Sequence, residues 1–395
     1  MEKTHIRTGF GLKEEIKETL DREYQSGLIE RIKASDWQYH QGNTTIKLAK
    51  EYGFCYGVDR SIDYAYQTVQ KFPDKKIYLT GEIIHNPFVN KRLIDKGVMF
   101  LSGQYNKGES IKDVQKEDIV ILPAFGVSVS ALNELKEIGC ILVDTTCGSV
   151  LNVWKHVKRF SKENYTALIH GKYYHEETIA TASQTDLSND GKYIIVRNFE
   201  ETDRVCEFIR GNGSKKDLLE YFKKAISPGF DPERDLLKIG VANQTTMLAN
   251  ESLKVAQMVK EAMIDRYGEE NIDTHFRSFD TICSATQERQ DAIIDLLDSG
   301  VDLTIIIGGF NSSNTNNLTN IAVRYGPAYH IEDGSALIDR EQIQHKLPDS
   351  QDIKKTTGWL PEGTLTIGVT AGASTPDSKI EEVINRILYL RSVNI

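Results

Sequence analysis

Three cysteines occur in similar local sequences, each between an apolar run and an amphipathic stretch. These sequences are Phe54-Cys55-Tyr56-Gly57, Thr146-Cys147-Gly148-Ser149 and Ile282-Cys283-Ser284-Ala285. Each is typical of a strand-to-helix turn, and a helix N-terminus favours the thiolate, which is the form that binds metals. Three thiolates with one vacant coordination position indicate an open, reactive metal site. An iron–sulfur cluster normally takes four cysteines, so three would leave one iron open to a substrate oxygen.

A single cysteine at a strand end is more often a small buried apolar residue than a ligand. Three cysteines at equivalent places in a repeat make that interpretation much weaker here. Cys140 and Cys206 lie outside such turns, and we interpret both as ordinary core residues.

Polar loops elsewhere in the chain indicate an anion site. Ser312-Ser313-Asn314 and Ser374-Thr375 offer hydroxyl, amide and backbone donors at expected helix starts. In His85-Asn86-Pro87, Asn86 is the expected cap, which leaves His85 to face a ligand. Taken one at a time, such serines and asparagines are more often ordinary N-caps, and such a histidine is more often a surface side chain.

The loop from His170 to Glu177 contains two histidines followed by Glu176 and Glu177. One of these adjacent carboxylates could transfer protons. The alternative is that both are first-turn residues favoured by the helix dipole.

The elements that position these residues alternate between short β-branched strands and amphipathic helices. Leu303–Ile307, for example, is followed by Gly308-Gly309 and then by apolar residues at helical spacing that end at Gly326-Pro327. Strand alternating with helix predicts α/β units with mostly parallel sheets. Ligands collect at the carboxyl ends of such strands, where all of these loops are expected.

Nine such units fall into three sets of three, each set containing one of the cysteines. We therefore predict three similar α/β domains around a pseudo-threefold axis, with the cluster at the centre. The predicted segments are an N-terminal appendage (1–45, with a helix near Glu14–Lys33), a first domain (46–143), a second domain (144–282, with a surface insertion at 203–235) and a third domain (283–395, with a surface insertion at 339–362).

The composition of the 395 residues excludes several classes of protein. Lys and Arg number 48 against 57 Asp and Glu, so the net charge is −9, and no basic cluster favours nucleic acid. No apolar stretch approaches the roughly 18 residues of a membrane span. Five cysteines are too few for a secreted disulfide scaffold. With no visible signal peptide, we expect a reducing cytoplasm, or a plastid stroma for a mature organellar form.

Several runs together resemble the LytB (IspH) family of 4-hydroxy-3-methylbut-2-enyl diphosphate reductases, in the longer form found in cyanobacteria and plastids. The resemblance extends from about Ile46 to Arg391. The runs that carry it are Gly53-Phe54-Cys55-Tyr56-Gly57-Val58, Asp144-Thr145-Thr146-Cys147, Gln244-Thr245-Thr246, Asn311-Ser312-Ser313-Asn314 and Thr370-Ala371-Gly372-Ala373-Ser374.

The resemblance implies an iron–sulfur oxidoreductase that removes the substrate hydroxyl reductively and yields isopentenyl and dimethylallyl diphosphate. It implies a [4Fe–4S] cluster on Cys55, Cys147 and Cys283, and an electron donor protein of the ferredoxin or flavodoxin type. It also implies a proton relay through Glu177 and Thr245, with His175 nearby. The implied residues for the small allylic diphosphate are His85, His175, Thr245, Ser312, Ser313, Asn314 and Ser374.

The chain departs from the family pattern in two places. Many relatives have a histidine where this chain has Phe125, which cannot donate a hydrogen bond, so we leave it out of the site. The loop from His170 to His175 is longer than in the short form. His175 and Glu177 align when the gap falls at Tyr173-Tyr174.

Two other functions are compatible with the same residues. One is a three-thiolate zinc hydrolase or lyase acting on a phosphorylated substrate. The other is an anion-binding or sensor protein with no catalytic activity. Metal content separates them from the reductase, because only the reductase requires iron.

Overall fold

The computed structural model describes residues 4–187, 191–279, 281–348, 350 and 352–392. These residues form two compact units, each of which is described by itself. Unit 1 contains residues 4–6, 78–81 and 100–283, and unit 2 contains residues 7–77, 82–99 and 284–392. Residues 1–3 of the predicted appendage lie outside the described residues.

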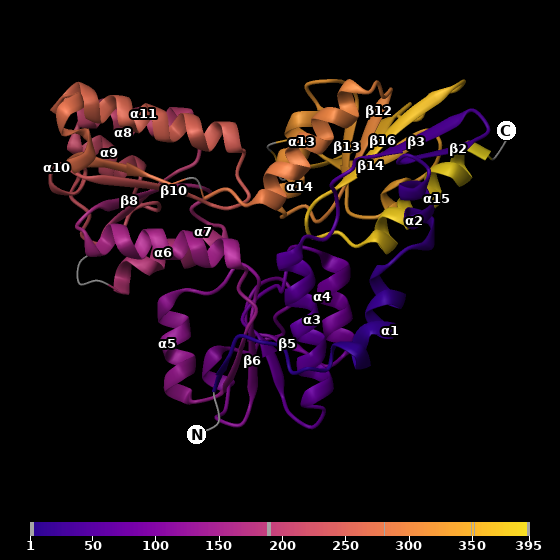
Figure 1. Cartoon of the computed structure of the whole chain (residues 1–395), viewed down its shortest axis with the longest axis horizontal. Helices are drawn as coiled ribbons and strands as arrows, with labels where there is room; N and C mark the ends of the chain where they lie inside the picture. Colours follow the sequence, from indigo (N-terminus) through magenta and orange to yellow (C-terminus); the bar gives the residue numbers. More distant parts are fainter. Residues whose placement is uncertain (1–3, 188–190, 280, 349, 351, 393–395) are drawn as a thin grey trace. The chain divides into compact units, whose positions relative to one another are not determined.

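One sheet of unit 1 has four strands in the order β11-β10-β8-β9, and all neighbours are parallel. Figure 1 shows α8 and α11 on one face of this sheet and α6 and α7 on the other. The strands are β8 (Thr166–His170), β9 (Tyr193–Val196), β10 (Ile239–Asn243) and β11 (Phe276–Ser278). The helices are α6 (Gly148–Lys162), α7 (Glu176–Ala182), α8 (Phe199–Arg210), α9 (Lys215–Tyr221), α10 (Pro232–Asp235), α11 (Ala249–Tyr267) and α12 (Ile272–His275).

The other sheet of unit 1 has five strands in the order β1-β7-β6-β4-β5. Its fully buried strand Ile119–Leu122 reads as a continuous apolar run, as expected for a sheet covered on both faces. The strands are β1 (His5–Ile6), β4 (Ile77–Leu79), β5 (Met99–Phe100), β6 (Ile119–Leu122) and β7 (Ile141–Asp144), and helix α5 (Val129–Ile138) follows β6.

Unit 2 is built on a seven-stranded sheet in the order β15-β14-β13-β12-β16-β3-β2. Helices α13 and α14 cover one face and α15 and α2 the other (Figure 1). The strands are β2 (Gln38–Gln41), β3 (Thr44–Leu48), β12 (Leu303–Ile307), β13 (Ala328–Ile331), β14 (Gln342–Lys346), β15 (Ile353–Thr357) and β16 (Leu365–Ala371). The helices are α1 (Lys13–Tyr24), α2 (Gly27–Ala34), α3 (Tyr56–Lys71), α4 (Pro87–Asp95), α13 (Ser284–Asp298), α14 (Ser313–Ala322) and α15 (Asp377–Ser392).

The prediction of α/β architecture with mostly parallel sheets is confirmed. In the seven-stranded sheet, β13-β12-β16-β3 are parallel, and only the pairs β13–β14, β14–β15 and β2–β3 are antiparallel. The division into three domains at 143/144 and 282/283 stays a prediction.

Strand β3 departs from the predicted domain scheme. The scheme placed Ile46 at the start of the first domain, but β3 pairs with β16 in the sheet of the C-terminal residues. The reason is packing, because Ile46 and Leu48 are buried in one cluster with Ile367 and Val369. The strand before Cys55 therefore extends the sheet that ends the chain.

The helix predicted near Glu14–Lys33 is two helices, α1 and α2. Ser26 breaks the run because its hydroxyl accepts a hydrogen bond from the Ile29 N–H (3.0 Å) and caps α2. Leu28, Ile29 and Ile32 are buried in the core of unit 2, so the apolar face docks as expected.

Neither predicted insertion is confined to the surface. In 203–235, Leu218, Phe222 and Phe230 are buried in the core of the four-stranded sheet. In 339–362, strands β14 and β15 form a hairpin that extends the seven-stranded sheet, and Trp359 is 1% exposed. Among the described residues, no helix combines the length and apolar character needed to cross a bilayer.

Candidate active site

The three cysteines of the repeated turns all lie at helix starts. Cys55 is the N-cap residue of α3, Cys147 is the N-cap residue of α6, and Cys283 directly precedes α13. All three are partly exposed. Each donates its backbone N–H to a loop after a neighbouring strand, and the acceptors are the carbonyls of Ala373 (3.3 Å), Ala124 (2.8 Å) and Thr245 (3.4 Å), respectively.

The other two cysteines have a different environment. Cys140 and Cys206 are each 1% exposed. Burial raises the pKa of the Cys140 thiol to about 11 and that of the Cys206 thiol to about 12. Their burial confirms their interpretation as core residues.

Unit 2 contains the predicted anion-binding residues at the start of α14. The Ser312 hydroxyl caps the helix by accepting a hydrogen bond from the Thr315 N–H (3.3 Å). The Asn314 Oδ1 accepts a hydrogen bond from the Ala373 N–H (2.9 Å). The Asn314 Nδ2 is buried and has no partner among the described residues. A buried donor of this kind is completed by a water or a bound anion.

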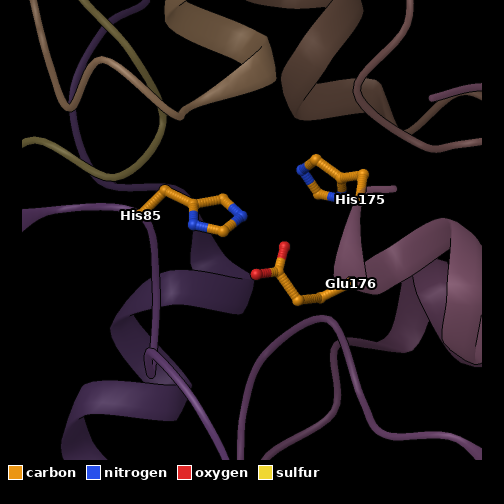
Figure 2. A group of neighbouring side chains, drawn as sticks. All are labelled: His85, His175 and Glu176. Atoms are coloured by element: carbon orange, nitrogen blue, oxygen red, sulfur yellow. The ribbon is translucent and has the colours of Figure 1, made fainter. Parts of the chain in front are cut away.

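His85 lies just before α4, where Asn86 caps the helix and Pro87 is the first helical residue. The His85 Nδ1 lies 2.9 Å from the Glu82 Oε2, which also accepts a hydrogen bond from the Asn311 Nδ2 (3.0 Å). An ionised carboxylate only accepts, so Nδ1 carries the hydrogen and the ring orientation is fixed. The ring is drawn in Figure 2.

Ser374 and Gly309 both lie against the His85 backbone carbonyl in unit 2. The Ser374 hydroxyl donates to the His85 carbonyl (3.1 Å). A Cβ at Gly309 would lie 2.5 Å from the same carbonyl oxygen, so glycine is required for this approach. In this structure the Ser374 hydrogen is engaged by His85, and the hydroxyl would have to rotate to bind an anion.

In unit 1, His175 is the N-cap residue of α7. Its Nδ1 accepts a hydrogen bond from the Glu177 N–H (3.2 Å), so the neutral ring carries its hydrogen on Nε2. Phe125 is buried and packs edge-on against this ring, with centroids 6.3 Å apart. The residue that replaces the expected histidine therefore helps to orient His175.

Glu176 and Glu177 have distinct environments. Glu177 is 3% exposed, and its Oε1 accepts a hydrogen bond from the Thr245 N–H (2.6 Å). Glu176 is exposed, and Figure 2 shows its carboxylate extending from the start of α7. Glu177 is in contact with the loop that receives the Cys283 N–H.

Sequence reasoning assigned no role to two residues that hold these loops. Glu82 orients His85, and its signal was an acid three positions before that histidine. The Gln244 Oε1 accepts hydrogen bonds from the Lys172 N–H (3.2 Å) and the Thr178 hydroxyl (3.1 Å), which joins the β8 and β10 loops. The other histidine of that loop, His170, is fully buried, and burial lowers its pKa to about 4, so it stays neutral.

The structure thus groups the predicted residues within each unit. Unit 2 holds Cys55, His85, Ser312, Ser313, Asn314 and Ser374, and unit 1 holds Cys147, His175, Glu177, Thr245 and Cys283. The three partly exposed cysteines at helix starts fit an iron–sulfur cluster by the chemistry of their donors. Their roles as ligands, like the roles of the substrate residues, stay predictions.

Comparisons with known proteins agree with the earlier resemblance. The chain is 45% identical over 390 residues to the 4-hydroxy-3-methylbut-2-enyl diphosphate reductase of Crocosphaera subtropica, covering 98% of this chain and 95% of the relative. It is 47% identical over 388 residues to the reductase of the same name from Thermosynechococcus vestitus, covering 98% and 95%.

Two solved structures are also similar. One is an (E)-4-hydroxy-3-methyl-but-2-enyl diphosphate reductase, with a TM-score of 0.53 and 28% identity over 87% of this chain and 99% of that chain. A Plasmodium falciparum reductase structure has a TM-score of 0.61 and 24% identity over 86% of each chain, which shows a shared fold. The model of the LytB protein family matches residues 46–388. The chain therefore belongs to the LytB protein family, whose members contain an iron–sulfur cluster.

Proposed function

We propose that this protein catalyses the reductive dehydroxylation of 4-hydroxy-3-methylbut-2-enyl diphosphate. The reaction takes two electrons and two protons, releases water, and leaves isopentenyl or dimethylallyl diphosphate, the last step of the methylerythritol phosphate route to isoprenoids. The observation that carries the proposal is the identity of 45–47% to reductases of that name over 98% of the chain.

We propose that Cys55, Cys147 and Cys283 hold a [4Fe–4S] cluster with one open iron. When bound, such a cluster supplies electrons one at a time and a Lewis-acidic iron for the departing hydroxyl. The location of all three cysteines at helix starts supports this assignment, because these termini favour thiolates. The donor of the electrons is then a small redox protein of the ferredoxin or flavodoxin type.

The diphosphate is proposed to bind without Lys or Arg from the named loops. The Asn314 amide, the Ser312 hydroxyl and the N-terminus of α14 provide donors in unit 2. The His175 Nε2–H provides one in unit 1. His85, Ser313, Thr245 and Ser374 complete the proposed set. Several uncharged donors and a helix dipole suit an anion that must later be released as product.

Glu177 is proposed to deliver a proton, because it is the buried carboxyl beside Thr245. Loss of hydroxide as water requires one proton, and protonation of the allylic carbon requires a second. The Thr245 hydroxyl can relay a proton, since a hydroxyl both donates and accepts. His175, held by the Glu177 N–H, is placed to share in substrate binding beside this relay.

The proposal is tested by anaerobic purification, metal analysis and product assay. We expect a brown protein with four irons per chain in the intact cluster, and turnover of the substrate to the two C5 diphosphates by a chemically reduced enzyme. Zinc in place of iron would support the three-thiolate hydrolase instead. Iron without turnover of this substrate would overturn the substrate assignment.

A further inference from the structure

Arg289 is a buried charged residue that the proposed function does not use. It lies on α13, six positions after Cys283, and is 3% exposed. A buried arginine is normally paired with a carboxylate. In the described residues, the hydrogen bonds of Arg289 all go to main-chain carbonyls. The charge of the guanidinium acts on Asp59, where it lowers the pKa against the larger effect of burial, which raises it.

The carbonyls that Arg289 binds belong to the turn just before Cys55. Its Nη2 donates to the carbonyls of Gly53 (2.9 Å), Phe54 (3.2 Å) and Tyr52 (3.4 Å). Its Nε donates to the Gly53 carbonyl as well (3.2 Å), and its Nη1 donates to Ala285 on its own helix (2.8 Å). A single side chain therefore joins three consecutive carbonyls of the Cys55 turn to the first turn of α13.

Strand β16 and its following loop hold the other side of the same turn. The Gly53 N–H donates to the Ala371 carbonyl (3.2 Å), and the Cys55 N–H donates to the Ala373 carbonyl (3.3 Å). Gly53 has φ +64°, a left-handed conformation that suits glycine. The N–H groups of this turn bind the end of β16 and the loop after it, and its carbonyls bind Arg289. The position of Cys55 is therefore held by hydrogen bonds on both sides of the turn.

We infer that Arg289 is a positioning residue for the cluster ligand Cys55 and supplies a fixed positive charge behind that ligand. This inference rests on the proposed function, since it assumes that Cys55 binds a cluster. Arginine is suited to both tasks, because its planar fork reaches several oxygens at once and it stays protonated at any physiological pH. Lysine would retain the charge without the fork.

The charge has a predictable effect on electron transfer. Reduction adds a negative charge to a cluster, and a nearby buried cation stabilises that added charge more than the oxidised form. Net charge and hydrogen bonding around an iron–sulfur cluster set its reduction potential. Removing the Arg289 charge should therefore make the cluster harder to reduce, so its potential should become more negative.

The test compares Arg289→Met, Arg289→Lys and the matched control Arg386→Met in anaerobically purified protein. Arg386 is a suitable control because it also donates to consecutive carbonyls, those of Leu337 (3.0 Å) and Ile338 (2.6 Å), away from the cysteine turns. Iron per chain, the electron paramagnetic resonance spectrum of the reduced cluster and its midpoint potential are measured for each variant.

We expect Arg289→Met to lower the equilibrium constant for one-electron reduction of the cluster by about tenfold or more. A tenfold change is a shift of the midpoint potential by about 59 mV to more negative values. Arg289→Lys should keep a potential near that of the unmodified protein but change the resonance spectrum, because Cys55 is less firmly held. Arg386→Met should match the unmodified protein in all three measurements.

Two results would overturn the inference. One is an Arg289→Met protein with unchanged iron content, spectrum and potential. The other, which applies even if the Met variant does not fold, is an Arg289→Lys protein identical to the unmodified one in spectrum and iron content. If the unmodified protein itself binds no iron, the proposed function fails instead, so the two failures are distinguishable.

Discussion

Two residues, one in each unit, link a side-chain oxygen to a cysteine through their own backbone N–H and carbonyl groups. In unit 2, the Ala373 N–H donates to the Asn314 Oδ1, and its carbonyl accepts a hydrogen bond from the Cys55 N–H. In unit 1, the Thr245 N–H donates to the Glu177 Oε1, and its carbonyl accepts a hydrogen bond from the Cys283 N–H. Asn314 and Glu177 are thus each linked through one residue to a proposed cluster ligand.

The two arrangements differ in the side chain that accepts the hydrogen bond from the backbone N–H, which is an amide in unit 2 and a carboxyl in unit 1. Asn314 is a neutral amide whose Nδ2 remains available as a donor, so it can bind an anion but cannot carry a proton. Glu177 is a carboxyl, so it can gain and lose a proton. The same hydrogen-bond pattern is therefore proposed to serve anion binding in unit 2 and proton transfer in unit 1, and the difference between amide and acid distinguishes the two proposed roles.

The three proposed cluster ligands, two of which end these arrangements, give the largest expected effect. Cys55→Ser, Cys147→Ser and Cys283→Ser should each lose the intact cluster and nearly all activity, because a serine oxygen is a poor ligand for iron–sulfur iron. Cys140→Ser and Cys206→Ser are the controls and should retain iron, although burying a hydroxyl costs stability. Iron analysis and visible absorption measure the outcome. A Cys147→Ser protein with full iron and turnover would refute the assignment.

Changing Glu177 to its amide makes unit 1 resemble unit 2 at this position. Glu177→Gln retains an acceptor for the Thr245 N–H but cannot deliver a proton, so kcat should fall about 10²–10⁴-fold with the cluster intact. Steady-state kinetics on iron-replete protein measures this. The matched control is Glu176→Gln, the exposed neighbour, which should retain near-normal kcat. Loss of activity in the Glu176 variant alone would move the relay to that residue.

The sequence predicted the local parts of these arrangements better than the long-range contacts. The cysteine turns and the Ser312 and Asn86 caps follow from patterns within a few residues, and the structure has them. Arg289 binds the Gly53 carbonyl across 236 positions, and no local pattern shows that contact. Ser26 split the predicted helix, because its hydroxyl offers the backbone an alternative partner.

Strand β3 shows a related limit of the sequence. Alternation of strand and helix predicts parallel sheets, but it does not say which sheet a strand joins. Burial of Ile46 and Leu48 beside residues more than 300 positions later decides the membership of β3. The choice between Glu176 and Glu177 was similarly ambiguous, because both fit a first helical turn, and burial of Glu177 separates them.

Asn314 provides the test of anion binding in unit 2. Asn314→Ala removes a donor to a charged group, so substrate affinity should fall about ten- to a hundred-fold, equivalent to about 1.5–3 kcal/mol. Asn314→Asp keeps the acceptor for the Ala373 N–H but repels an anion, so its affinity should fall at least as far. Binding of substrate or diphosphate by calorimetry measures both. If Asn314→Asp binds normally, the amide does not contact the anion.

His170, in unit 1, should make the free energy of unfolding depend on pH in the acid range. Its pKa is about 4 in the folded protein, below the usual value near 6.5, so the unfolded chain binds more protons between those two pH values. Stability should therefore fall as pH drops through this range, by about 2 kcal/mol at pH 5 for this residue. His170→Asn should lose part of that dependence in urea unfolding at pH 7 and pH 5. Equal pH dependence in both proteins would show that His170 titrates normally.

The helix cap in unit 2 gives the smallest expected effect. The Ser312 hydroxyl accepts a hydrogen bond from the Thr315 N–H, so Ser312→Ala should cost about 1 kcal/mol of stability, the usual contribution of an N-cap. In the unmodified protein the Ser312 hydroxyl can also donate its own hydrogen to an anion, so Ser312→Ala should weaken substrate binding as well.

Ser312→Asp separates the two roles, because aspartate caps a helix well but repels a diphosphate. Thermal unfolding and substrate calorimetry should therefore diverge, with stability retained and affinity lost in the Asp variant. If Ser312→Asp binds as tightly as the unmodified protein, Ser312 acts only as a cap, and the anion donors of unit 2 are reduced to Asn314 and its neighbours.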